Sequence, residues 1–134
     1  MPKKILVIED DPENRKLIEF ILNEAGYVVV LAIDGGDGLE KAISESPDVI
    51  ITDIAMPRLD GLRLIQLLRT TTAFRYLPIL AITSFGAERA TEALKAGADH
   101  ALARPIRNEF LIQAVQSLIQ NARPISGPIP APPH

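Results

Sequence analysis

The chain has 134 residues, of which 47% are hydrophobic and 23% are charged, and its net charge at pH 7 is −3. This length and composition are typical of one soluble globular domain with its own core. No apolar run is long enough to span a membrane or to act as a signal peptide. The acidic balance and the few aromatic residues argue against nucleic-acid binding by this domain. Because cysteine is absent, disulfides and thiolate metal sites are excluded, and a cytoplasmic location is favoured.

Five short apolar runs, each bounded by polar residues, glycine or proline, predict buried β-strands. A helix is predicted after each strand, because apolar residues recur there every three or four positions. Asp11 is the predicted N-cap of the first helix, Pro12 opens it, and Asp60 can cap the third. Gly26 and Gly97 are predicted to end the first and fourth helices. The predicted strands cover residues 5–8, 28–33, 49–52, 79–82 and 101–103.

The predicted helices each carry an apolar face. In the fourth helix, at about 87–96, this face is mostly alanine, so we expect it to be the least firmly anchored helix. The faces consist of Leu17, Ile18, Ile21, Leu22 and Ala25; Leu39, Ala42 and Ile43; Leu64, Ile65 and Leu68; Ala87, Ala90, Ala93 and Leu94; and Phe110, Leu111, Ala114, Val115, Leu118 and Ile119.

The last segment, residues 123–134, has five prolines in the eleven residues from Pro124 onward. Such a composition cannot form helix or sheet, so it predicts a disordered or polyproline-like segment. The folded domain is therefore expected to cover residues 1–122. A passive tail and a linker to an output domain are both compatible with the segment.

The regular alternation of strands and helices predicts an α/β fold with a five-stranded parallel sheet and helices on both faces. Right-handed crossovers and five strands favour the flavodoxin-like, doubly wound strand order 2-1-3-4-5. In that order the first and third strands are neighbours, which places Glu9 and Asp10 beside Asp53. Thr83 and Arg104 end the strands on the other side of Asp53.

This arrangement predicts phosphate chemistry. Three carboxylates in one crevice repel each other unless they share a cation, and hard oxygen ligands favour Mg²⁺ together with phosphate oxygens. Asp53, central in the sheet, is the candidate nucleophile and would form an aspartyl-phosphate. The Thr83 hydroxyl can donate to a phosphoryl oxygen, and Arg104 can neutralise its charge. The simpler alternative makes Asp53 an ordinary turn residue and Glu9-Asp10 a solvated acidic loop.

Several motifs at strand ends resemble those of the response-regulator receiver domain of bacterial two-component signalling. The similarity covers about residues 3 to 122. The ordered set of motifs is specific, although no single motif decides the assignment. The matching segments are 5–12, 53–57, Asp60-Gly61, 81–84, 95–99 and Arg104-Pro105.

The resemblance implies a role for each matching residue. Asp53 would be the phosphoacceptor, and Thr83 the switch hydroxyl that moves toward the phosphoryl group. Asp10 would bind Mg²⁺ directly and Glu9 through water, with the backbone carbonyl of Ala55 as the third protein ligand. Receivers of this family act as phosphoacceptors, with self-phosphotransfer and autodephosphorylation, rather than as enzymes with turnover.

The resemblance also implies the partners. A phosphohistidine on a sensor histidine kinase or a histidine phosphotransfer protein would donate the phosphoryl group. The added charge of about −1.5 to −2 would shift a two-state surface around the last two helices and the strand between them. That surface would contact a downstream effector protein. The sequence leaves homodimerisation open.

Two positions depart from the family pattern. Arg104 stands where the family has a lysine; it keeps the charge, but its planar guanidinium is not an equivalent group. Ala101 stands where the family often has an aromatic switch residue. By analogy with the family, the Arg104–Pro105 peptide bond is expected to be cis.

Three other functions are compatible with parts of the pattern. A haloacid-dehalogenase-type phosphatase needs a second aspartate two residues after the nucleophile, where this chain has Ala55. A nucleotide-binding module is suggested by the glycines at 35–38, but they follow the second strand and their aspartate would repel phosphate. A degenerate receiver that binds a partner without phosphorylation is favoured by Arg104 and Ala101. The retained residues Glu9, Asp10, Asp53 and Thr83 argue instead for working chemistry.

Overall fold

The computed structural model describes residues 2–56, 60–84 and 86–121. The predicted boundary at 122, the proline-rich segment and Pro57 lie outside these residues. The elements are β1 (Lys4–Ile8), α1 (Pro12–Glu24), β2 (Val28–Ala32), α2 (Gly35–Glu45), β3 (Val49–Asp53), α3 (Gly61–Thr70), a 3₁₀ turn η1 (Thr72–Phe74), β4 (Ile79–Thr83), α4 (Gly86–Ala96), β5 (His100–Ala103) and α5 (Asn108–Gln120).

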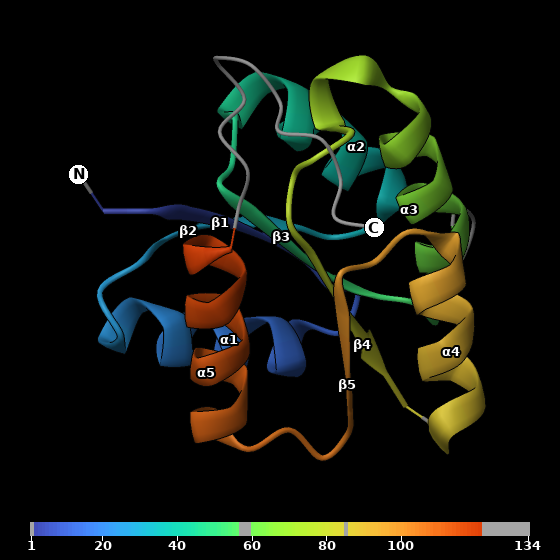
Figure 1. The fold of residues 1–134 in the computed structure, drawn as a ribbon. Coiled ribbons are helices and arrows are strands. Elements are labelled where there is room, and N and C mark those ends of the chain that lie inside the picture. Colours follow the sequence, from blue (N-terminus) through green and yellow to red (C-terminus); the bar gives the residue numbers. More distant parts are fainter. Residues whose placement is uncertain (1, 57–59, 85, 122–134) are drawn as a thin grey trace.

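The five strands form one parallel sheet in the order β2-β1-β3-β4-β5, which confirms the predicted fold and topology. Helices α1 and α5 cover one face of the sheet, and α2, α3 and α4 cover the other (Figure 1). Within the described part of the chain, no helix is both long and apolar enough to cross a membrane.

Both faces of the central strands are buried, which explains why their sequences are continuous apolar runs rather than alternating ones. In β1, Leu6 and Ile8 belong to the core layer under α2, α3 and α4. Ile5 and Val7 belong to the layer under α1 and α5. The sheet is therefore held from both sides, and its strand ends are fixed relative to one another.

The strand ends differ slightly from the predicted ones. β3 continues to Asp53 and β4 to Thr83, because backbone pairing extends one residue beyond the apolar run. β2 ends at Ala32, and the following Ile33 is exposed. Because they are the last residues of β3 and β4, Asp53 and Thr83 are held in place by the sheet itself.

The predicted helix ends are confirmed. The Asp11 side chain accepts from the Asn14 N–H at 3.0 Å, and Asp60 accepts from the Arg63 N–H at 2.8 Å. Gly26 and Gly97 have φ angles of 97° and 126°, values that favour glycine. These caps fix the chain directions on either side of the sheet.

The predicted apolar faces were wrong at five positions, one of them Ala25 at the end of α1, which is exposed. The other four, Leu17, Ile43, Leu94 and Phe110, are 56%, 66%, 49% and 51% exposed. Each lies at the margin of its stripe, and each helix buries a narrower strip against the sheet than the apolar spacing suggests. In α4, only Ala93 is fully buried among the described side chains.

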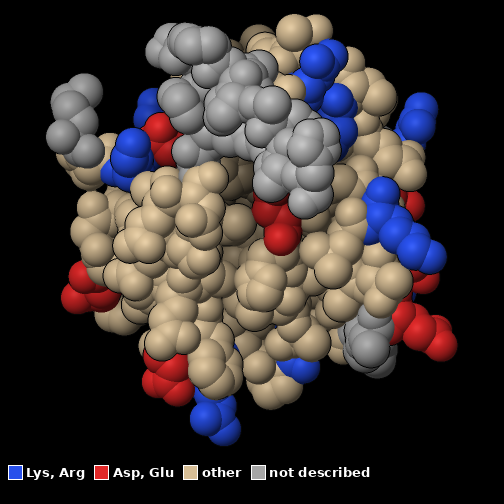
Figure 2. All heavy atoms as spheres, viewed as in Figure 1, with Lys and Arg blue, Asp and Glu red and all other residues tan. Residues whose placement is uncertain are grey.

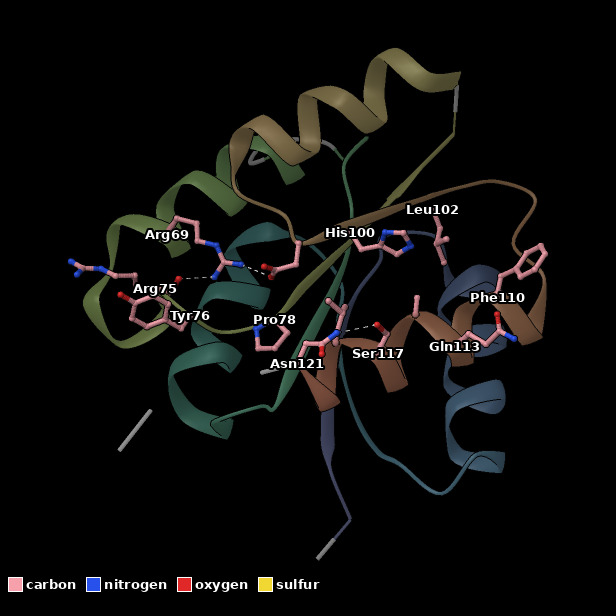
Figure 3. Close-up of a pocket in the computed structure, with 13 residues that line it drawn as sticks. Arg69, Arg75, Tyr76, Pro78, His100, Leu102, Phe110, Gln113, Ser117 and Asn121 are labelled. Carbon is pink, nitrogen blue, oxygen red and sulfur yellow. Dashed lines mark hydrogen bonds and ion pairs between the residues drawn. The ribbon is translucent and has the colours of Figure 1, made fainter. Parts of the chain in front are cut away.

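A single arginine contacts several loops at the edge of the sheet where β4 and β5 begin. Arg69 donates to the backbone oxygens of Gly97 and Leu77 at 2.8 and 2.7 Å. It also pairs with Asp99 at 2.7 Å, and Figure 3 shows Arg69 beside a cavity. The Asp99 carboxylate also accepts from the Ile79 N–H. The contacts fix the amino-terminal ends of β4 and β5.

Candidate functional site

Three carboxylates meet at the carboxyl ends of β1 and β3. One oxygen from each of Glu9, Asp10 and Asp53 lies within 4.8 Å of the others. The strands are adjacent, with Ile8 opposite Thr52, so the residues that follow Ile8 reach Asp53. Glu9 and Asp53 are only 1% and 6% exposed, whereas Asp10 is exposed. The structure therefore brings together the three acidic residues that the sequence singled out.

Arg104 enters the same cluster from the end of β5. Its Nη2 lies 3.2 Å from each carboxylate oxygen of Glu9 and 3.4 Å from Oδ2 of Asp53. The Arg104 N–H donates to the Thr83 carbonyl at 2.8 Å, and the Arg104–Pro105 peptide bond is cis. A cation thus bridges the two buried carboxylates.

The pKa of Glu9 is raised from an ordinary value of 4.5 to about 7. Burial is the largest cause, a hydrogen bond with Asp53 and the charge of Asp53 add to it, and Arg104 and Asn14 partly oppose the shift. It costs free energy to keep two neighbouring buried carboxylates both negatively charged, and the single positive charge of Arg104 does not neutralise two negative charges. The donor set therefore fits a hard divalent cation, which would relieve the excess negative charge.

Two buried donors near Asp53 have no hydrogen-bond partner among the described residues: Oγ1 of Thr83 and Nε of Arg104. Thr83 is fully buried and follows Ile82, the ladder partner of Asp53. Buried polar groups are rarely left unpaired. The site therefore has two donors that could form hydrogen bonds with a bound anionic group.

The backbone around Asp53 is tightly held. The Ala55 N–H donates to Oδ1 of Asp53 at 3.1 Å, and Oγ1 of Thr52 donates to the Asp53 carbonyl at 2.9 Å. A Cβ at Gly61 would collide with the Asp53 carbonyl and with Cα of Ile54. The sequence identifies Gly61 only as part of the predicted start of a helix. The close approach of its backbone to that of Asp53 and Ile54 cannot be seen in the spacing of residue types.

The acidic loop has a contact that sequence reasoning missed. Nη1 of Arg15 lies 2.8 Å from the Glu9 carbonyl and 3.4 Å from the Asp10 carbonyl. Arg15 belongs to the first turn of α1. Its side chain folds back along the chain, which no spacing of residue types predicts.

Ala101, which stands in place of an aromatic switch residue, is partly buried against the core, and the neighbouring His100 is exposed. A cavity of about 750 Å³ lies near His100, away from the acidic cluster, between η1, β5 and α5 (Figure 3). It does not include the acidic cluster. Its lining includes Tyr76, His100, Phe110 and Ser117.

A second cavity, about 430 Å³, adjoins the cluster through Arg104. It is an apolar groove between α1 and the start of α5. The surface over α5 is largely uncharged in Figure 2. The groove is lined by Asn14, Leu17, Ile18, Ile21, Arg104, Pro105, Ile106 and Leu111.

A family model described as the response regulator receiver domain matches residues 5–116. Response regulator MprA from Mycobacterium sp. (strain KMS) is 37% identical over 129 residues, which are 96% of this chain and 55% of MprA. The chain therefore spans about half the length of that relative. Protein PilG from Pseudomonas aeruginosa is 32% identical over 123 residues, which are 91% of each chain.

Solved structures show the same fold. The chemotaxis response regulator CheY4 of Vibrio cholerae has a TM-score of 0.83 and 31% identity, covering 88% of this chain and 99% of its own. A putative response regulator from Chloroflexus aurantiacus has a TM-score of 0.88 and 30% identity, covering 90% and 100%.

Proposed function

The chain belongs to the response regulator receiver family of two-component systems, and on this basis we propose that Asp53 accepts a phosphoryl group from a phosphohistidine. The observation that supports the proposal is the set of charged and hydrogen-bonding groups that surround Asp53. Glu9 and Asp10 lie on one side of it. On the other side, Thr83 ends β4 with a hydroxyl that has no partner among the described residues, and Arg104 follows β5.

The chain's own groups each serve the transfer. A carboxylate oxygen of Asp53 forms a bond to phosphorus, and the phosphorus–nitrogen bond of the donor breaks. The bonding electrons pass to the imidazole nitrogen, which takes up a proton. The guanidinium of Arg104 stabilises negative charge on the phosphoryl oxygens, and Thr83 donates a hydrogen bond to one of them. The phosphorylated protein thereby gives both orphaned donors a partner.

Mg²⁺ is the proposed cofactor. Asp10 and Asp53 would bind it directly with the Ala55 carbonyl, and Glu9 would act through water. When bound, the ion neutralises charge on the transferred group. The support from the structure is the cluster of three acidic residues, two of them buried, in which burial and the neighbouring Asp53 raise the pKa of Glu9.

The phosphodonor is a sensor histidine kinase or a histidine phosphotransfer protein, and its proposed docking site is the apolar groove beside Arg104. Leu17 lines this groove and is 56% exposed, and Phe20, one turn further along α1, is also exposed. Exposed apolar side chains next to a reactive group suit a protein partner. The proposed output is a changed surface for a downstream effector protein in the cytoplasm.

A second candidate is a degenerate receiver that binds its partner without phosphorylation. The observation in its favour is that Arg104 already pairs with both Glu9 and Asp53. An arginine that held both carboxylates permanently would block the metal and the phosphoryl group. The two candidates differ in whether Asp53 reacts at all.

The test is incubation with acetyl phosphate, with and without Mg²⁺, followed by intact mass measurement. The expected result is a Mg²⁺-dependent gain of one phosphoryl group that is absent in Asp53→Asn. Asp10→Asn should weaken the Mg²⁺ titration. Labelling that persists in Asp53→Asn would move the site elsewhere. No gain, together with no binding of beryllofluoride, would favour the degenerate receiver.

A further inference from the structure

Arg15 links the first turn of α1 to the backbone of the acidic loop. Its Nη1 donates to the Glu9 carbonyl at 2.8 Å and approaches the Asp10 carbonyl at 3.4 Å. The Glu9 N–H is held separately by the Ala32 carbonyl at 3.1 Å. The Arg15 contact therefore holds the carbonyl of the peptide between Glu9 and Asp10, and the Ala32 contact holds the N–H of the peptide before it.

The orientation of this peptide decides where the Asp10 carboxylate points. Rotating the peptide plane changes ψ of Glu9 and φ of Asp10, and so moves the Asp10 side chain relative to Asp53. Asp10 is exposed, and among the described residues no side-chain hydrogen bond to its carboxylate is seen. Among the described residues, the backbone contact from Arg15 is thus a restraint on the peptide that orients this carboxylate.

Arg15 also has an opposing effect. Its positive charge lies close to a cluster that is proposed to bind a dication, and like charges repel. Removing this charge alone would strengthen cation binding, whereas removing the positioning contact would weaken it. The two effects have opposite signs, so an affinity measurement separates them.

We propose that Arg15 is a positioning residue that sets the geometry of the Asp10 carboxylate and thereby selects Mg²⁺ over larger cations. The inference rests on the proposed function, because it concerns the metal site of the same crevice. Mg²⁺ demands near-ideal octahedral geometry, whereas Ca²⁺ accepts flexible geometry with more ligands. A loosened carboxylate therefore impairs Mg²⁺ binding more than Ca²⁺ binding.

The experiment is calorimetric titration of the full chain with Mg²⁺ and, separately, with Ca²⁺. For Arg15→Met, the dissociation constant for Mg²⁺ should rise about tenfold, as for other residues that orient metal ligands. The constant for Ca²⁺ should change by less than about threefold because its coordination is adaptable. A purely structural or electrostatic role would change both constants alike.

Lys16→Met is the matched control. Lys16 is the next residue, is exposed, and its side chain has no hydrogen bond or ion pair to the described residues. The Lys16→Met variant loses the same charge without losing a contact to the loop at Glu9 and Asp10, so Mg²⁺ binding should stay unchanged or tighten slightly. If Arg15→Met unfolds, Arg15→Lys retains the charge and should still lower the ratio of Mg²⁺ to Ca²⁺ affinity.

The outcomes are distinct. An unchanged ratio in the folded Arg15 variant, or tighter Mg²⁺ binding as in the control, would overturn the role of Arg15. Absence of Mg²⁺ binding by the unchanged protein would instead overturn the proposed metal site itself.

Discussion

Arg104 and Glu9 are 95 positions apart in the chain, yet Nη2 of Arg104 lies 3.2 Å from each carboxylate oxygen of Glu9. The same nitrogen lies 3.4 Å from Asp53. Arginine differs from the lysine usual in the family because it has several donors on a planar group. One of them, Nε, is buried without a partner among the described residues, so Arg104 retains a donor for an anion on Asp53.

Replacing Arg104 by methionine should leave two buried carboxylates without their cation. The pKa of Glu9 should then rise above about 7, because Arg104 currently lowers it. Loss of one partner of a mostly buried ion pair should reduce the free energy of unfolding at pH 8 by about 2–4 kcal/mol. Urea unfolding and a carboxyl NMR titration measure the two effects. Arg107→Met is the control, because Arg107 is exposed and lies over Phe110, and equal losses in both variants would contradict the prediction.

Glu9 should make the stability of the metal-free protein depend on pH. Its pKa is about 7 in the folded protein, against an ordinary value of 4.5 that applies to the unfolded chain. The folded protein therefore retains a proton that the unfolded chain loses, and stability should fall as pH rises from about 4.5 through 7, by about 1–3 kcal/mol. Urea unfolding in EDTA from pH 5 to 8 measures this slope. Glu9→Gln should remove most of it, and an identical slope in both proteins would show that other groups are responsible.

Gly61 should be intolerant of a side chain. A Cβ would collide with the backbone at Asp53 and Ile54, so Gly61→Ala should destabilise the fold by about 1–3 kcal/mol through overpacking. It should also slow phosphorylation by acetyl phosphate, because the collision displaces Asp53. The control is Gly36→Ala in α2, where the nearest atom lies at an ordinary 3.6 Å. Alanine at position 36 should be neutral or slightly stabilising. Equal urea midpoints for the Gly61→Ala and Gly36→Ala variants would refute the predicted collision.

The apolar groove should matter for a protein donor but not for a small one. The double change of Leu17→Ala, which lines the groove, and Phe20→Ala, an exposed residue one turn further along α1, should slow phosphotransfer from any phosphorylated histidine phosphotransfer protein that labels the unchanged chain. The expected loss is about tenfold or more, since buried apolar contacts at an interface contribute on the order of 1–2 kcal/mol each. Acetyl phosphate labelling should stay the same. Ile43→Ala, an exposed position on α2, is the control, and a similar loss there would contradict a specific groove.

The sequence predicted the topology well because the strands that form the sheet are continuous apolar runs with a carboxylate or hydroxyl at their ends. The strand order then followed from general rules of connection, and with it the meeting of Glu9, Asp10 and Asp53. The burial of Leu17 and Ile43 was mispredicted, because periodicity does not show how wide a strip each helix buries.

Other features of the site depend on the reach of long side chains or on contacts between backbones. The bridge from Arg104 to Glu9 and the contact from Arg15 to the loop carbonyls arise only in three dimensions. The approach of Gly61 to Asp53 is likewise invisible in a list of residue types. Such features require coordinates, because residue spacing specifies faces and edges but not the path of a side chain.

Thr83 should behave in opposite ways in the two states of the protein. Its buried hydroxyl has no partner among the described residues. Thr83→Val should therefore be neutral or stabilise the unphosphorylated protein by up to about 1 kcal/mol, because an unpaired polar group is removed without loss of volume. The same change should weaken beryllofluoride binding several-fold, because the phosphoryl mimic loses a hydrogen bond.

Thr52→Val is the matched control for that change. The Thr52 hydroxyl is also buried, but it donates to the Asp53 carbonyl at 2.9 Å. Its removal should destabilise the unphosphorylated protein by about 1 kcal/mol, the ordinary contribution of such a bond. Urea unfolding and calorimetric titration with beryllofluoride measure both variants. If Thr83→Val destabilised the free protein as much as Thr52→Val, the hydroxyl would already have a partner, and the unpaired donor beside Asp53 would not exist.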